Sequence, residues 1–126
     1  MKRLSFSREK RLISSRQFKS VLDSGQRLSN GILTLYMAKN GFDYARLGVS
    51  VSKSCGSAVV RNRLKRLLRE AFRQSQEMIP AGFDYFLMIS PGWMKKASGE
   101  KAKRQPTFEQ VRNSFLALVN SADLSK

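Results

Sequence analysis

Hydrophobic positions follow a helical period between Ala58 and Gln74. They recur three or four residues apart, which gathers them on one side of a helix, and they are Val60, Leu64, Leu67, Leu68, Ala71 and Phe72. The basic positions on the opposite side are Lys65, Arg66, Arg69 and Arg73. A solvated helix would also be polar there, but it usually mixes both charge signs, and Glu70 is the one acid in this segment. The pattern favours a helix that packs on a core with one side and faces nucleic acid with the other.

A shorter helix is predicted between Ser14 and Gly25. A capping box of Ser14 and Gln17 begins it, and Gly25 in a left-handed conformation ends it. Its apolar stripe consists of Phe18, Val21 and Leu22. Phe18 is most simply a core residue, although an aromatic ring that faces a groove could instead stack on an unpaired base.

Three segments have the length and pattern of β-strands. Residues 32–39 are rich in β-branched and aromatic residues, and residues 84–90 form a mostly apolar run. Residues 45–52 alternate strictly and place Leu47, Val49 and Val51 on one face. The other face of that strand is small and polar, and either a nucleotide or solvent could lie against it. A further short strand is predicted at 26–29 or near Tyr44.

The remaining segments complete the outline of the fold. A last helix is predicted after Pro106, where Thr107 and Gln110 form a second capping box. Ser57 is the predicted N-cap of the long helix, whose first turn with Lys53 nearby could bind phosphate. Cys55 is predicted to pack in the interior. One mixed sheet covered by helices accounts for this order of elements.

The composition indicates an anionic partner. The chain has 126 residues, with 24 lysines and arginines against 9 acids and a formal net charge of +15 at pH 7. Nucleic acid or an anionic membrane surface is the expected partner. No apolar run is long enough to span a membrane and the first residues do not resemble a signal peptide, so we expect a cytoplasmic protein. We expect one RNA-binding domain over residues 1–126, with a basic arm at about 1–13 and an irregular basic loop at about 91–105.

The same composition argues against a catalytic site in the protein itself. There is no histidine and only one cysteine, so the commonest general base and a zinc cluster are both excluded. The carboxylates are scattered rather than paired within an apolar frame. We therefore expect neither catalytic residues nor a metal site on the chain, and any reactive groups must come from a partner.

The segment from Arg46 to Arg69, RLGVSVSKSCGSAVVRNRLKRLLR, resembles the signature of the bacterial ribonuclease P protein subunit. In that family a strand, a Ser-Lys loop and an Arg-Asn-Arg helix follow one another at this spacing. The resemblance implies an α/β (α+β) two-layer sandwich similar to the second domain of ribosomal protein S5. It implies a mixed four-stranded sheet with a left-handed β-α-β crossover and the order α-β-β-β-α-β-α.

The resemblance also implies a function. The protein would bind the catalytic RNA of ribonuclease P and the 5′ leader of precursor tRNA, and would assist an endonucleolytic removal of the leader in which Mg²⁺ is held mainly by the RNA subunit. By matching position, the residues implied to contact the RNA subunit are Lys53, Arg61, Asn62, Arg63, Lys65, Arg66 and Arg69. The residues implied to line a leader cleft between the first helix and the sheet are Phe18, Leu22, Tyr36, Arg46 and Ser50.

Two other classes of protein would share the basic α/β pattern. A structural ribosomal protein is the alternative with the same charge balance, and the Arg-Asn-Arg helix after Ser-Lys argues against it. A helix-turn-helix DNA-binding protein would require a short helix before Ala58, and a strand is predicted there instead.

Overall fold

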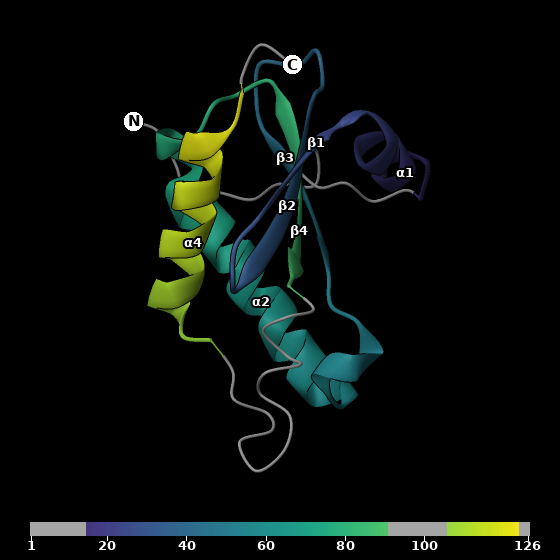
Figure 1. Cartoon of the computed structure of the whole chain (residues 1–126), viewed down its shortest axis with the longest axis vertical. Helices are drawn as coiled ribbons and strands as arrows, with labels where there is room; N and C mark the ends of the chain where they lie inside the picture. Colours follow the sequence, from purple (N-terminus) through teal and green to yellow (C-terminus); the bar gives the residue numbers. More distant parts are fainter. Residues whose placement is uncertain (1–14, 91–105, 124–126) are drawn as a thin grey trace.

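The computed structural model describes residues 15–90 and 106–123 (Figure 1). Its helices and strands, in chain order, are α1 (Ser15–Ser24), β1 (Gln26–Ser29), β2 (Leu33–Lys39), β3 (Arg46–Ser50), α2 (Ala58–Ser75), β4 (Phe83–Ile89) and α4 (Phe108–Ser121). This confirms the predicted order and the long helix over nearly its predicted length. The further short strand lies at 26–29 rather than near Tyr44. The predicted arm at 1–13, the loop at 91–105 and the Ser14 cap lie outside the described residues.

The four strands form one mixed sheet in the order β1-β2-β4-β3. β2 is antiparallel to both of its neighbours, and β3 runs parallel to β4. The parallel pair is connected through α2, which confirms the predicted β-α-β unit. The handedness of that crossover stays a prediction.

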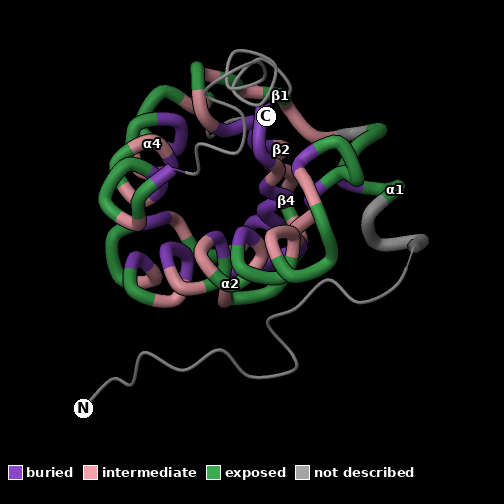
Figure 2. The backbone as a smooth tube through the Cα atoms, turned by 90° about the horizontal axis from the view of Figure 1, so that it is seen from below, coloured by how far each residue is buried: buried purple, intermediate pink, exposed green. Residues whose placement is uncertain are grey.

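The sheet separates two layers of helix (Figure 1). α2 and α4 lie together on one face, and α1 lies on the other, where it packs mainly on β2 and β4. In Figure 2 the buried parts of the chain turn toward the space enclosed by α2, α4 and the sheet. The main core occupies that space, because both helices direct their apolar stripes into it.

The main core is built from the stripe that the helical period predicts. Leu64, Leu68, Ala71 and Phe72 are buried, whereas Val60 and Leu67 lie half-buried at its borders. The rings of Phe72, Tyr85 and Phe115 join α2, β4 and α4, with centroids 5.9 to 6.2 Å apart. Burial of each large side chain stabilises the fold by about 1.5 to 3 kcal/mol in gross terms. Cys55 is buried in the same core, as predicted.

Two of the predicted helix caps are present. Ser57 accepts a hydrogen bond from the Val60 amide at 3.4 Å and begins α2. Thr107 and Gln110 form the full capping box of α4, with bonds of 2.9 and 3.1 Å. These contacts satisfy amides that a helix start leaves without an intrahelical partner.

Gly25 ends α1 for a different reason from the one predicted. Its φ is not positive, so the left-handed conformation expected from the sequence is wrong. Instead, a Cβ at this position would lie 2.5 Å from the Val21 carbonyl oxygen in the last turn of α1 and 2.7 Å from the Met37 carbonyl oxygen of the neighbouring strand β2. Only glycine allows the end of α1 to approach the sheet this closely.

Replacing Gly25 with alanine tests this close approach. We expect Gly25→Ala to lower the free energy of unfolding by about 2 kcal/mol, because two backbone oxygens must move. Gly31→Ala is the control, since a Cβ at Gly31 meets nothing within 4 Å, and a change below about 0.5 kcal/mol is expected. Urea unfolding measures both, and equal effects of the two variants would contradict this account.

Candidate nucleic-acid interface

The packing of α2 determines which of its basic side chains reach solvent. Asn62, Arg63, Arg66 and Arg69 are exposed, whereas Arg61 and Lys65 are half-buried because they border the apolar stripe. The Nε of Arg61 is buried and has no hydrogen-bond partner among the described residues. Lys53 is exposed in the short turn Lys53–Cys55, which packs against the start of α2. The structure thus brings together the seven residues implied to contact the RNA subunit, on α2 and at its beginning.

A surface hollow of about 310 Å³ lies on the exposed side of α2. Its lining residues are Asn62, Arg66, Arg69, Glu70 and Arg73. Arg73 is not among the residues carried over from the family resemblance, although the helical period places it on the same side. We call the exposed residues Asn62, Arg63, Arg66 and Arg69, together with Arg73, the basic face of α2.

Glu70 is the acid within this hollow. Its carboxylate accepts hydrogen bonds from Nε and Nη2 of Arg73, the former at 3.0 Å, and from Nε2 of Gln74 at 2.7 Å. These bonds, above all those from Arg73, lower the pKa of Glu70 from its ordinary value of 4.5 to about 2. Glu70 is therefore ionised at neutral pH and offsets one positive charge, and the hollow keeps an excess of arginine.

The second candidate surface is the side of the sheet on which α1 lies, which we call the α1 face. Val21 of α1 and Phe86 of β4 are buried there, with Tyr36, Ala38 and Met88 packed around them. The rings of Tyr36 and Phe86 lie 6.3 Å apart between centroids. This small cluster is separate from the main core and fixes α1 above β2 and β4.

Three of the residues implied to line the leader cleft share the α1 face. Tyr36 lies opposite Phe86, and the parallel pairing places Arg46 beside Asp84 and Ser50 beside Met88. Leu22 is predicted to belong to the apolar stripe of α1 together with Val21. That prediction is wrong, because Leu22 is 40% exposed whereas Val21 is buried. Phe18 belongs to α1, but its side chain lies outside the described residues. The cleft itself stays a prediction.

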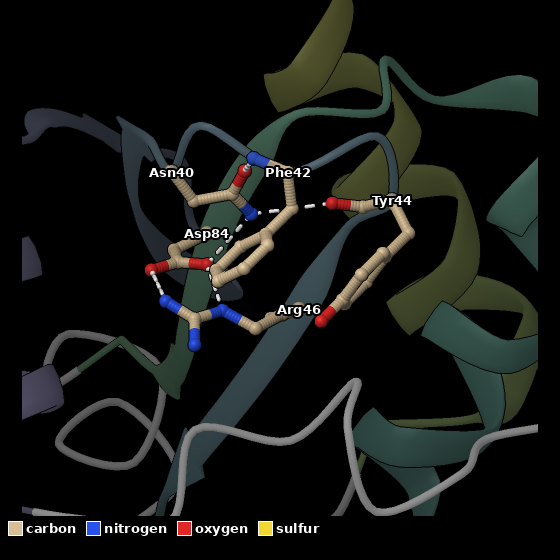
Figure 3. Close-up of polar contacts among 5 residues, drawn as sticks. All are labelled: Asn40, Phe42, Tyr44, Arg46 and Asp84. Carbon is tan, nitrogen blue, oxygen red and sulfur yellow. Dashed lines mark hydrogen bonds and ion pairs between the residues drawn. The ribbon is translucent and has the colours of Figure 1, made fainter.

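Arg46 is held by an ion pair that sequence reasoning missed (Figure 3). Its Nε and Nη2 donate to the two carboxylate oxygens of Asp84, both at 2.7 Å. The side chains are only 15% and 8% exposed. The hydrogen bonds to Asp84 raise the pKa of Arg46, so the guanidinium stays charged. Asn40 also donates to Asp84, at 2.9 Å.

The sequence contains one sign of this ion pair, which is the acid Asp84 in an apolar strand. Its partner can be identified only from the register of β3 against β4. Asp84 is an acid inside an otherwise apolar strand, and such a residue is rarely buried without a partner. Arg46 occupies the corresponding position of the neighbouring parallel strand. Two of its five N–H groups donate to Asp84, so three remain for another acceptor. Arg46 thus combines a structural role with a residual donor capacity on the α1 face.

Neither a cluster of metal ligands nor a membrane-spanning helix is present in the described part of the chain. Within residues 15–90 and 106–123, no three acidic or cysteine side chains come together as metal ligands. Over the same ranges, no helix is both long enough and apolar enough to cross a membrane.

Comparison with known proteins gives one consistent result. A family model described as Ribonuclease P matches residues 6–122. A ribonuclease P protein component from Thermotoga petrophila is 42% identical over 85% of this chain and 82% of its own length. One from Brevibacillus brevis is 44% identical, over 94% of this chain and 87% of its own. The solved structure of the RNase P protein from Thermotoga maritima is 37% identical, with a TM-score of 0.75 over 90% of this chain and 97% of that one.

The Arg46–Asp84 pair is open to a direct test. We expect Asp84→Ala to lower the free energy of unfolding by about 3 kcal/mol, because it leaves a guanidinium unpaired where water has little access. The double variant Asp84→Ala, Arg46→Met should regain part of that loss, since the unpaired charge is then gone. Denaturant unfolding of the two single variants and the double variant measures the coupling. Strictly additive effects would show that the pair does not act as a unit.

Proposed function

Because the chain belongs to the ribonuclease P protein family, we propose that its basic α2 face binds the catalytic RNA of ribonuclease P and its α1 face binds the 5′ leader of precursor tRNA. Membership of this family makes the chain a ribonuclease P protein component with a part in tRNA processing. It argues against the alternative that the chain is a structural ribosomal protein. The observation that carries the proposal is the separation of the two surfaces, which lie on opposite sides of one sheet.

The basic face of α2 suits a structured RNA. Its arginines present planar guanidinium groups that can hold phosphate oxygens through two hydrogen bonds at once. Arg66 and Arg69 line the hollow, and Arg63 is exposed on the same helix. Because the stripe of α2 is fixed in the core, these side chains lose less freedom on binding than those of a mobile tail would. Phosphate contacts of this kind give affinity and position with little reading of base sequence.

The α1 face suits a single strand. Tyr36 offers an aromatic ring, and Arg46 and Ser50 follow on the neighbouring strand with donor groups. Aromatic rings combined with basic and hydroxyl groups bind unpaired nucleotides with little sequence preference. Leu22 adds an exposed apolar side chain from α1. We infer that the leader runs over this face while the RNA subunit occupies α2, so that the two ligands do not compete.

In this proposal the chemistry belongs to the RNA. The described residues gather no set of metal ligands, and both Asp84 and Glu70 are engaged by arginines. They do not fit a magnesium site, so we assign Mg²⁺ mainly to the RNA subunit. The protein then neutralises phosphate repulsion and positions the leader. We place this work in the cytoplasm.

Reconstitution with the RNA subunit tests the function. We expect the protein alone to leave precursor tRNA intact, and the protein with the RNA subunit to cleave it at a lower Mg²⁺ concentration than the RNA alone requires. The basis is that bound arginines replace part of the cation screening that close RNA phosphates need. Cleavage rates over a Mg²⁺ titration measure this. Cleavage by protein free of RNA, or an unchanged Mg²⁺ requirement, would refute the proposal.

The role of α2 is tested by the salt dependence of RNA binding. We expect the double variant Arg63→Ala, Arg66→Ala to weaken binding to the RNA subunit and to reduce the slope of log K against log salt by ~0.7 to 0.9 for each phosphate that the variant no longer binds. Lys19→Ala is the control, because it removes one charge from α1, on the other side of the sheet. Affinity over a salt series measures both variants. A slope that falls equally in the control would count against α2 as the contact surface.

A further inference from the structure

Phe42 is an aromatic residue that no part of the function above uses. It lies in the loop between β2 and β3 and is 47% exposed, although it stands beside a buried ion pair. Its ring lies over the guanidinium of Arg46, 4.8 Å from Cζ to the ring centroid. It also stacks on Tyr44, with centroids 5.2 Å apart and 25° between the ring planes. The loop therefore holds two aromatic rings beside a guanidinium, with much of the Phe42 side chain open to solvent.

The loop that carries Phe42 is braced by hydrogen bonds on several sides (Figure 3). The side-chain oxygen of Asn40 accepts from the Phe42 amide at 2.8 Å. The Asn40 side-chain nitrogen donates to the Tyr44 carbonyl at 3.2 Å and to Asp84 at 2.9 Å. The backbone of Gly82 pairs with Asn40 at 2.9 Å and with Tyr44 at 3.2 Å. The ring is therefore held in place before any ligand arrives, which lowers the entropic cost of stacking on it.

The position of Phe42 places it on the proposed path of the leader. Arg46 and Asp84 lie side by side in the sheet, and Asp84 stands two residues before Phe86, the partner of Tyr36. Tyr36 and Arg46 are therefore displaced by two residues along the strand direction. At about 3.3 Å per residue, this displacement is roughly 7 Å. Phe42 covers Arg46, so it extends the α1 face at this end of the sheet.

The charges around Phe42 indicate what kind of contact it makes. Arg46 offsets the carboxylate of Asp84, so that acid does not repel a phosphate chain. Asp43 is exposed on the same loop and contributes a negative charge of its own. An attraction based on phosphate contacts is therefore weak here, and the ring itself is the feature that a nucleotide can use. The favoured ligand is an unpaired base, because every base has a π face.

We propose that Phe42 is a stacking site for one unpaired base of the precursor tRNA leader, beyond Tyr36 and Arg46 on the α1 face. This inference rests on the proposed function of that face. The Asn40–Asp84–Arg46 network holds the ring, and the base stacks on its exposed part. The leader then contacts the protein over a longer path than the first helix and the sheet alone provide.

The test uses the complete enzyme, with the protein bound to its RNA subunit. The substrates are precursor tRNAs that differ only in the length of the single-stranded leader. We expect Phe42→Ala to weaken binding of the long-leader substrate at least about fivefold, and to leave binding unchanged once the leader is trimmed too short to reach the loop. The loss should be the same factor at every salt concentration, because stacking releases no counterions.

Two further substitutions separate stacking from simple hydrophobic contact. Phe42→Trp keeps an aromatic face and should retain the affinity, whereas Phe42→Leu keeps an apolar side chain and should lose it. Met78→Ala is the matched control, since Met78 is also a large exposed apolar residue and is 56% exposed. Unfolding by urea should show that each of these variants is still fully folded under the conditions of the binding assay.

The outcomes distinguish this inference from the function on which it rests. If the parent enzyme binds long and trimmed leaders equally, the proposed role of the α1 face is wrong. If leader length matters but Phe42→Ala has no effect, or Phe42→Leu retains full affinity, only the stacking site is wrong. A loss that shrinks as salt rises would identify a phosphate contact and would also overturn it.

Discussion

The burial of the apolar stripe of α2 is the contact on which the rest of this structure depends. Leu64, Leu68 and Phe72 are fully buried against β3 and α4 and the rings of the core. A helix turns by about 100° per residue, so burying one stripe fixes the rotation of every other side chain. The outward direction of Arg66 and Arg69 is thus a consequence of core packing. A rotation by one residue would drive a guanidinium into the interior, at a cost that the core could not offset.

The sheet separates two candidate binding surfaces, the basic face of α2 on one side and the α1 face on the other. Its α2 side is filled by two helices, while its other side carries only α1 over β2 and β4 among the described residues. Polar and aromatic residues can therefore remain on the α1 face without disturbing the main core. The buried pair of Arg46 and Asp84 belongs to this second surface and connects its parallel strands through side chains. It also neutralises an acid that would otherwise oppose RNA, and it supports the aromatic ring of Phe42.

Several elements could be derived from the sequence because local signals and burial agree. The alternation in residues 45–52 predicts which face of this segment turns to the core, and Leu47 and Val51 are buried there while Val49 is half-buried. The Thr107 cap and the stripe of α2 follow from equally local rules. Gly25 shows the limit of such rules. A glycine at a helix end suggests a left-handed turn, whereas here the carbonyls of Val21 and Met37 exclude any side chain.

The sequence by itself determined the order of the elements, the two sides of α2 and the strongly basic balance of the chain, because periodicity and charge are properties of neighbouring residues. The tertiary structure alone decided that Asp84 meets Arg46 and that Phe42 lies over the guanidinium. The Arg46–Asp84 contact depends on the pairing of β3 with β4, and no local pattern specifies that register. Strand pairing brings together Arg46 and Asp84, which are 38 positions apart in the chain. It thereby decides which donors of Arg46 are left for a ligand.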